Sequence, residues 1–135
     1  MPRIKWDDSY SVGVHSLDEQ HKKLVAMANQ LHEAMSAGKG KEVIEPILND
    51  MLDYTRQHFS AEEKLLEKYN YPGLGDQKRE HEAFFKKVTE MQLELKAKNL
   101  TLSIEVSQFL RSWITGHILG IDKQYTHFLN SKGEK

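Results

Sequence analysis

The chain of 135 residues contains no cysteine. This absence excludes disulfide bridges, iron–sulfur clusters, thiolate zinc sites and cysteine nucleophiles. Any metal in this protein must therefore be held by histidine, aspartate and glutamate, a set of donors that suits iron, manganese or zinc better than soft metals.

The sequence also lacks a large net charge and a long apolar run. Charged residues make up 29% of the chain, yet the net charge is only -1 with histidine neutral. Such a balance gives no reason to expect nucleic acid or an anionic membrane surface as a partner. No apolar run approaches membrane length, and the start, MPRIKWDDSYSVGV, does not form a signal peptide. We therefore expect a cytoplasmic monomer with no nucleic-acid partner and no integral membrane segment.

Proline and glycine are few and clustered, and the stretches between the clusters are rich in helix-forming residues. Apolar residues recur there at steps of three and four, which predicts helices over residues 16–37, 41–69, 76–98 and 102–129. Short connections between long helices favour an all-α fold, an up-down-up-down antiparallel four-helix bundle, as a single domain over residues 1–135. Trp6, Tyr10, Val12 and Val14 predict that residues 1–15 form an N-terminal arm across this bundle.

Each predicted helix carries a metal-ligand residue type on the face that should point into the core. These residues are His21, His58, Glu62, His81 and His117. A carboxylate in a core is costly unless it is paired or binds a metal. His58 and Glu62 can reach the same ion, because residues at i and i+4 share one face of a helix. Together the four helices predict a metal site inside the bundle.

Asp122 follows His117 by five residues, which on a regular helix separates the two side chains by roughly 140°. The apolar stripe of the fourth helix shifts at the same point. One extra residue absorbed as a π-bulge, eased by Gly116 and Gly120, would bring both side chains to one face. We therefore predict a π-bulge here and include Asp122 among the candidate ligands.

The order HxxxE, then QxxxH, then HxxxxD resembles the hemerythrin family. The segments WDDSYSVGV, DEQHKKL, YTRQHFSAEE, YNYP and WITGHILGID resemble those of its bacterial single-domain members, and the resemblance covers essentially the whole chain. It implies a four-helix bundle with two iron ions, joined by an oxo or hydroxo bridge, that bind dioxygen. It also implies an oxygen carrier, store or supplier that is not an enzyme, and the sequence identifies no protein partner for oxygen delivery.

The resemblance assigns roles to individual positions. The implied metal ligands are His21, His58, Glu62, His81, His117 and Asp122. The first two histidines would ligate one iron and the last two the other, with both carboxylates bridging the pair. Ile114 and Ile118 would line the oxygen pocket, and Trp113 and Tyr125 would pack beside it.

Gln77 departs from the family pattern, which has a third histidine at this position on the iron held by His81 and His117. Glutamine has no imidazole, and its amide oxygen is a neutral, weaker donor. Either Gln77 coordinates iron through that oxygen, or it withdraws and leaves the position to water or empty. Both alternatives give an asymmetric centre, and they predict faster oxidation of the reduced centre and an oxidase- or peroxidase-like side activity.

Two other functions compete with dioxygen binding. A position opened at Gln77 would suit a redox enzyme or iron-handling protein with ferroxidase, peroxidase or nitric oxide chemistry. A purely structural bundle is disfavoured, because Glu62 and Asp122 would then lie uncompensated in the core. Glu63 is interpreted as a solvated surface charge. The histidines interpreted as lying outside the site are His15, His32 and His127.

Overall fold

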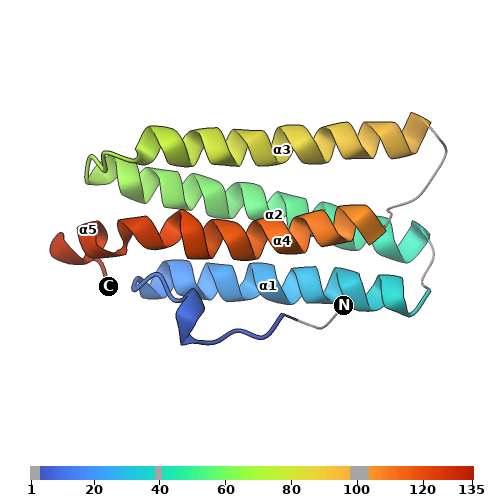
Figure 1. The fold of residues 1–135 in the computed structure, drawn as a ribbon, viewed down its shortest axis with the longest axis horizontal. Coiled ribbons are helices and arrows are strands. Elements are labelled where there is room, and N and C mark those ends of the chain that lie inside the picture. Colours follow the sequence, from blue (N-terminus) through green and yellow to red (C-terminus); the bar gives the residue numbers. More distant parts are fainter. Residues whose placement is uncertain (1–3, 39–40, 98–103) are drawn as a thin grey trace.

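The computed structural model describes residues 4–38, 41–97 and 104–135. Its long helices are α1 (His15–Ser36), α2 (Lys41–Lys68), α3 (Leu74–Ala97) and α4 (Ile104–Gly120), and short helices flank them: η1 (Asp8–Tyr10), η2 (Asp122–Tyr125) and α5 (Thr126–Ser131). No strand occurs in these ranges, so the prediction of an all-α four-helix bundle is confirmed (Figure 1). The predicted end of the third helix at residue 98 and the predicted start of the fourth at residue 102 lie outside the described residues.

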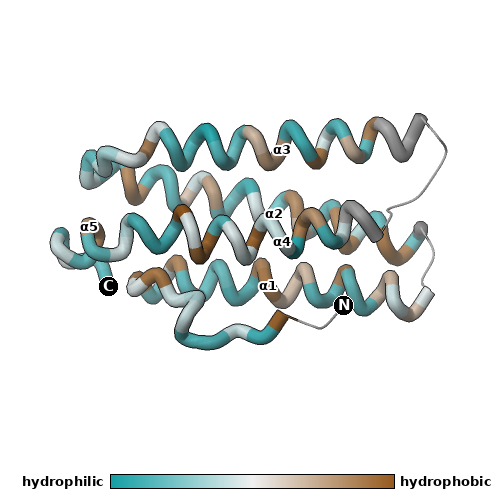
Figure 2. Tube along the Cα trace, in the orientation of Figure 1, coloured by the Kyte–Doolittle hydropathy of each residue, from teal (hydrophilic) through white to brown (hydrophobic). Residues whose placement is uncertain are grey.

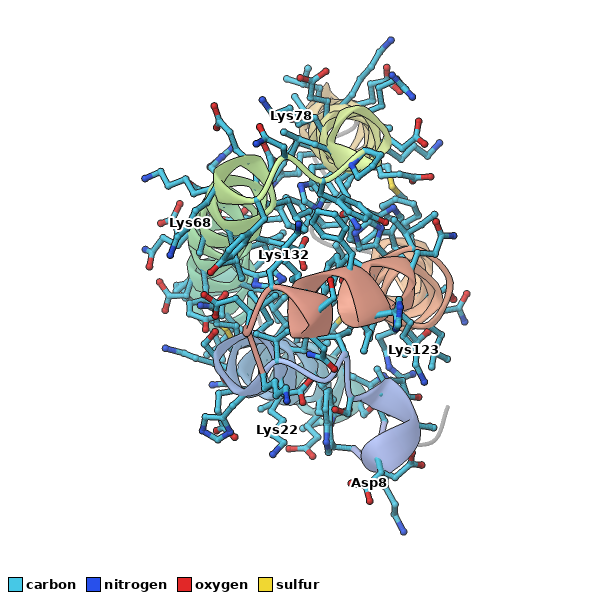
Figure 3. The ribbon with its side chains drawn as sticks, turned by 90° about the vertical axis from the view of Figure 1, so that its left-hand side faces the viewer. Asp8, Lys22, Lys68, Lys78, Lys123 and Lys132 are labelled. Atoms are coloured by element: carbon cyan, nitrogen blue, oxygen red, sulfur yellow. The ribbon has the colours of Figure 1, made fainter. Side chains whose placement is uncertain are left out.

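Each long helix packs against two others. The helix α1 contacts α2 and α4, and α3 contacts the same two helices. An end-on view shows the four helices around an interior filled with side chains (Figure 3), and hydrophilic and hydrophobic residues alternate along every helix (Figure 2). None of the helices in the described ranges combines the length and the apolar character needed to cross a membrane.

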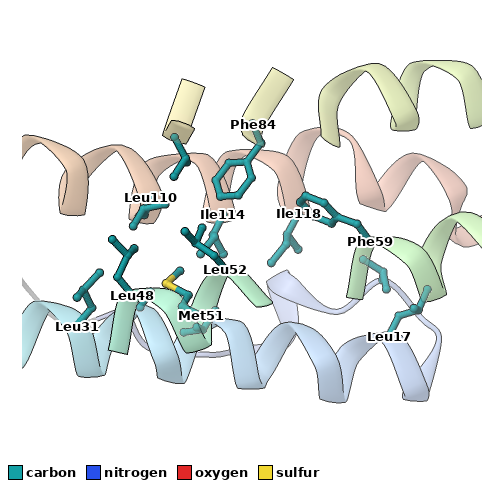
Figure 4. Close-up of a cluster of buried hydrophobic side chains, with 14 of the residues drawn as sticks. Leu17, Leu31, Leu48, Met51, Leu52, Phe59, Phe84, Leu110, Ile114 and Ile118 are labelled. Atoms are coloured by element: carbon teal, nitrogen blue, oxygen red, sulfur yellow. The ribbon is translucent and has the colours of Figure 1, made fainter. Parts of the chain in front are cut away.

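The interior of the bundle is apolar along most of its length. Leu31, Leu48 and Leu110 lie at one end of the buried cluster and Leu17 at the other, with Ile114 among the side chains between them (Figure 4). The predicted metal ligands interrupt this core in the N-terminal halves of α1 and α3, in the C-terminal halves of α2 and α4, and, with Asp122, at the start of η2. Because neighbouring helices are antiparallel, these halves meet at the same end of the bundle.

The N-terminal arm lies against the bundle. Val12 is fully buried, and its carbonyl oxygen accepts a hydrogen bond of 2.6 Å from the Thr126 hydroxyl. The ammonium group of Lys123 donates to the carbonyl oxygen of Ser9 at 2.8 Å. The arm is thus fastened to the segment that follows α4.

The chain breaks after α4 where the sequence predicts a continuous helix with a π-bulge. The helix ends at Gly120, Ile121 forms a turn, and the chain continues as η2 and α5. Glycine is a poor helix former. The hydrogen bonds that Lys123 and Thr126 donate to the arm fix the direction of the segment after the break. The prediction of a π-bulge is therefore wrong. The break still leaves the Asp122 side chain in the interior, where it is fully buried.

Candidate metal centre

The structure brings together all six side chains predicted to ligate metal. Every one of them is buried, with 6% exposure or less. Their donor atoms form two groups, and within each group the atoms lie within 4.8 Å of one another: His21, His58, Glu62 and Asp122, and Glu62, His81, His117 and Asp122. Both groups contain both carboxylates. This overlap is the arrangement expected of two metal positions bridged by Glu62 and Asp122.

Glu62 divides its two carboxylate oxygens between the groups. Its Oε2 lies 3.5 Å from the Nε2 atom of His21 and 3.5 Å from that of His58. Its Oε1 lies 3.1 Å from the Nε2 atom of His81. One carboxylate therefore faces histidines of both groups.

Asp122 is divided in the same way. Its Oδ2 lies 3.2 Å from the Nε2 atom of His21, and its Oδ1 lies 2.9 Å from the Nε2 atom of His117. The helix break at Ile121 places the Asp122 carboxylate opposite that of Glu62. Histidines of both groups surround these two carboxylates.

Many of these inward-facing atoms are buried without a hydrogen-bond partner among the described residues. They include the Nε2 atoms of His21, His81 and His117, the Oε1 atom of Glu62 and both oxygens of Asp122. Buried polar groups are rarely left unsatisfied, because each costs free energy. Cations between them would satisfy these atoms, and a set of imidazole and carboxylate donors fits iron, manganese or zinc.

Without metal, the pKa values of the cluster residues depend on burial and on the neighbouring charges. Burial lowers the pKa of His21, but the nearby carboxylates of Asp122 and Glu62 outweigh it and raise the pKa to about 9. Burial lowers the pKa of His58 to about 4, against the opposing effect of Glu62. Burial raises the pKa of Glu62, but the surrounding histidines, above all His58, hold this pKa well below its usual value. At neutral pH the metal-free cluster thus keeps a proton on His21, between two carboxylates.

Two histidines are oriented by partners outside the cluster. The Nδ1–H group of His58 donates to the Oε1 atom of Gln20 at 2.6 Å, and the Nδ1–H group of His81 donates to the Oε2 atom of Glu63 at 2.7 Å. Hydrogen bonds of this kind fix the ring and leave Nε2 free for a metal. The interpretation of Glu63 as a solvated charge is therefore wrong. The spacing along α2 does not reveal which side chain of α3 it meets.

Tyr125 also contacts the cluster from outside. Its hydroxyl donates a hydrogen bond of 2.8 Å to the Oε2 atom of Glu62, and burial raises the pKa of Tyr125 well above its usual value, so the hydroxyl keeps its proton. The sequence resemblance places Tyr125 beside an oxygen pocket. In the structure this side chain supports the carboxylate of Glu62 and does not line the cavity next to the cluster.

That cavity lies between α1, α2 and α4. It is lined by His21, Leu24, Thr55, His58, Phe59, Trp113, Ile114, His117, Ile118 and Asp122. The family resemblance places Ile114, Ile118 and Trp113 near such a pocket, whereas Leu24, Thr55 and Phe59 were not predicted to line it. The centre of a water-sized molecule has about 10 Å³ available there, which is room for about one small molecule.

Aromatic rings hold two of the imidazoles in place. Phe59 stacks on His81, with ring centroids 3.7 Å apart and an interplanar angle of 3°. Trp113 stacks on His117, with a centroid distance of 4.3 Å and an angle of 11°. These contacts restrict the orientation of both imidazole rings.

Gln77 lies one turn before His81 on α3, and its side chain is 1% exposed. Its amide nitrogen donates a long hydrogen bond of 3.5 Å to the carbonyl oxygen of Ile121, the residue before Asp122. Its amide oxygen has no hydrogen-bond partner in the described part of the chain. The glutamine is therefore buried beside the cluster but held weakly.

Comparison with known proteins agrees with this geometry. Residues 12–129 match the model of the hemerythrin HHE cation binding domain. The chain belongs to the hemerythrin family. The family resemblance predicted from the sequence motifs is thus confirmed, and the buried histidine–carboxylate cluster lies within the matched cation-binding domain.

Individual hemerythrin relatives are similar over most of their length. A bacteriohemerythrin of Stenotrophomonas maltophilia (strain R551-3) is 35% identical over 125 residues, which cover 93% of this chain and 80% of that protein. A hemerythrin-like protein of Naegleria gruberi is 35% identical over 122 residues, which cover 90% of each. A crystal structure of wild-type hemerythrin superposes with a TM-score of 0.83 at 27% identity, covering 93% of this chain and 97% of the other.

Metal binding is expected to release protons at neutral pH. The pKa of His21 is raised to about 9 in the metal-free protein, so this histidine carries a proton that a metal must displace. Anaerobic titration of ferrous iron into metal-free, weakly buffered protein should release about one proton or more per chain near pH 7. The release should fall as the starting pH is raised through the pKa of His21. A proton release that does not change with pH would contradict this account of His21.

The hydrogen bond between Glu63 and His81 makes a second prediction. The substitution Glu63→Gln removes the carboxylate that orients His81, and metal affinity should fall by about tenfold or more. The control Glu82→Gln removes the same charge from an exposed position on α3. Competition with a chelator measures both affinities. Equal effects of the two substitutions would show that overall charge, and not the hydrogen bond, controls metal binding.

Proposed function

We propose that this protein binds dioxygen reversibly at a pair of non-haem iron ions and acts as an oxygen carrier, store or supplier. The observation that carries the proposal is the pair of four-residue donor groups that share Glu62 and Asp122 beside a small apolar cavity. The names of the relatives, bacteriohemerythrin and hemerythrin-like protein, support the same function.

Each candidate ligand has a distinct place in this proposal. His21 and His58 would hold one iron, and His81 and His117 would hold the other. The carboxylates of Glu62 and Asp122 would bridge the two ions. Two iron ions held there would supply the electrons that dioxygen binding requires. Gln20, Glu63 and Tyr125 would keep the ligands in position.

The cavity favours reversible binding over conversion of dioxygen. Besides the candidate ligands, its walls are aliphatic and aromatic side chains and Thr55. The hydroxyl group of Thr55 donates to the carbonyl oxygen of Met51 at 2.7 Å, so its proton is directed to the backbone. A dry, apolar pocket hinders proton delivery, and the reduction of dioxygen to water or hydrogen peroxide consumes protons.

Gln77 is the feature that favours a second function, a diiron redox enzyme or an iron-handling protein. Its buried amide oxygen is a weak neutral donor beside His81, where the sequence resemblance implies a third histidine. A weaker donor would leave the iron of the His81 and His117 group more accessible. Faster oxidation of the reduced centre is the expected consequence.

An optical spectrum of the reduced, iron-loaded protein separates these functions. The spectrum is recorded before oxygen is admitted, after its admission and again after flushing with inert gas. We expect a visible charge-transfer band that appears with oxygen and fades on flushing. An immediate change to a stable ferric spectrum would instead favour redox chemistry, and the absence of any spectral change would mean that no diiron centre forms.

The variant Gln77→His is the matched control for this experiment, because it restores the histidine implied by the family pattern. If the glutamine weakens one iron position, the variant should oxidise several-fold more slowly than the unsubstituted chain. Equal oxidation rates would show that Gln77 does not control the redox behaviour.

A further inference from the structure

A second pocket lies next to Gln77 and is much larger than the apolar cavity. Its volume is about 440 Å³, against about 10 Å³ for the cavity on the same measure. The residues that matter here are Gln77, Asp76, Arg79, Glu80, Ile121 and Gln124. The pocket and the cavity share no lining residue, so the cluster is approached from two separate directions.

Gln77 is the side chain that links this pocket to the cluster. It lines the pocket, although only 1% of its surface is exposed. Its amide nitrogen makes one long hydrogen bond of 3.5 Å to Ile121, and its amide oxygen has no partner in the part of the chain that the structure describes. A buried amide with one weak bond loses little when it rotates away.

The charges around the pocket select against anions. Asp76 forms an ion pair with Arg79, one turn along α3, and Glu80 adds a further negative charge to the lining. Gln77 and Gln124 contribute neutral amides. This slightly acidic entrance favours a neutral ligand over an anion, and the volume of the pocket accepts a molecule of the size of imidazole.

We propose that Gln77 is a displaceable plug, and that this pocket admits a small neutral nitrogen or oxygen donor to the metal position of His81 and His117. The inference rests on the proposed function, since it requires a metal in that position. The apolar cavity would then take dioxygen, and the polar pocket would take a larger ligand from the other direction.

Imidazole is the probe for this proposal, used at about pH 8, where the free base predominates. Calorimetry measures imidazole binding to three iron-loaded proteins, namely the unsubstituted chain, Gln77→Ala and Gln77→His. The substitution Gln77→Ala removes the side chain that competes with imidazole. Imidazole binding should therefore tighten by about tenfold, the ratio expected when one competing hydrogen bond is lost. In Gln77→His a strong internal ligand should weaken imidazole binding by about tenfold or more.

The control Gln124→Ala shortens a glutamine of the same pocket that does not adjoin the cluster. It should change imidazole affinity by no more than about twofold. Equal affinities in the unsubstituted chain, Gln77→Ala and Gln77→His would overturn the proposal, and so would an effect of Gln124→Ala as large as that of Gln77→Ala. If Gln77→Ala does not fold, the imidazole affinities of the unsubstituted chain and of Gln77→His still decide the question.

Iron content and the oxygen-dependent spectrum of the same samples separate failure of this inference from failure of the proposed function. An unsubstituted chain that takes up no iron overturns both. An unsubstituted chain that takes up iron and binds dioxygen, but whose imidazole affinity does not depend on residue 77, overturns the plug alone.

Discussion

The burial of two carboxylates, Glu62 and Asp122, is the constraint on which the rest of this structure depends. Neither side chain is exposed to solvent, and an uncompensated buried charge would cost several kcal/mol. Histidines from three different helices surround Glu62 at 3.1 to 3.5 Å. The packing of the helices and the break after α4 both keep these carboxylates next to the histidines.

The two sides of the cluster differ in a way that relates to function. One side has a small apolar cavity, lined by aromatic rings that also stack on the imidazoles. A wider pocket is lined by the weakly bonded Gln77, which lies one turn before His81. A histidine at position 77 would be a strong metal ligand and would not move aside for another ligand. Under the proposed function and the proposed role of Gln77, the glutamine would make the centre asymmetric both in its metal ligands and in its access.

The bundle and the candidate ligands on the four long helices could be predicted from the sequence because both depend on the periodicity of single helices. Helical periodicity identifies the buried face, and it places His58 and Glu62 on that face together. The missed features depend on contacts between helices. The hydrogen bond that His81 donates to Glu63 and the stacking of Phe59 on His81 both depend on how α2 and α3 pack.

The break at Ile121 was unpredictable for a similar reason. It is held by bonds such as that from Lys123 to Ser9, which join residues far apart in the sequence. Periodicity correctly showed that His117 and Asp122 do not share a face of a regular helix. It gave no information on the N-terminal arm, and so it could not distinguish a bulge from the end of a helix.

The most direct test of two metal positions bridged by Glu62 and Asp122 is anomalous diffraction at the iron edge from crystals of the iron-loaded protein. We expect two separate peaks inside the bundle, each within bonding distance of both carboxylates and of two histidines. A single peak, or two peaks that do not share Glu62 and Asp122, would contradict this account.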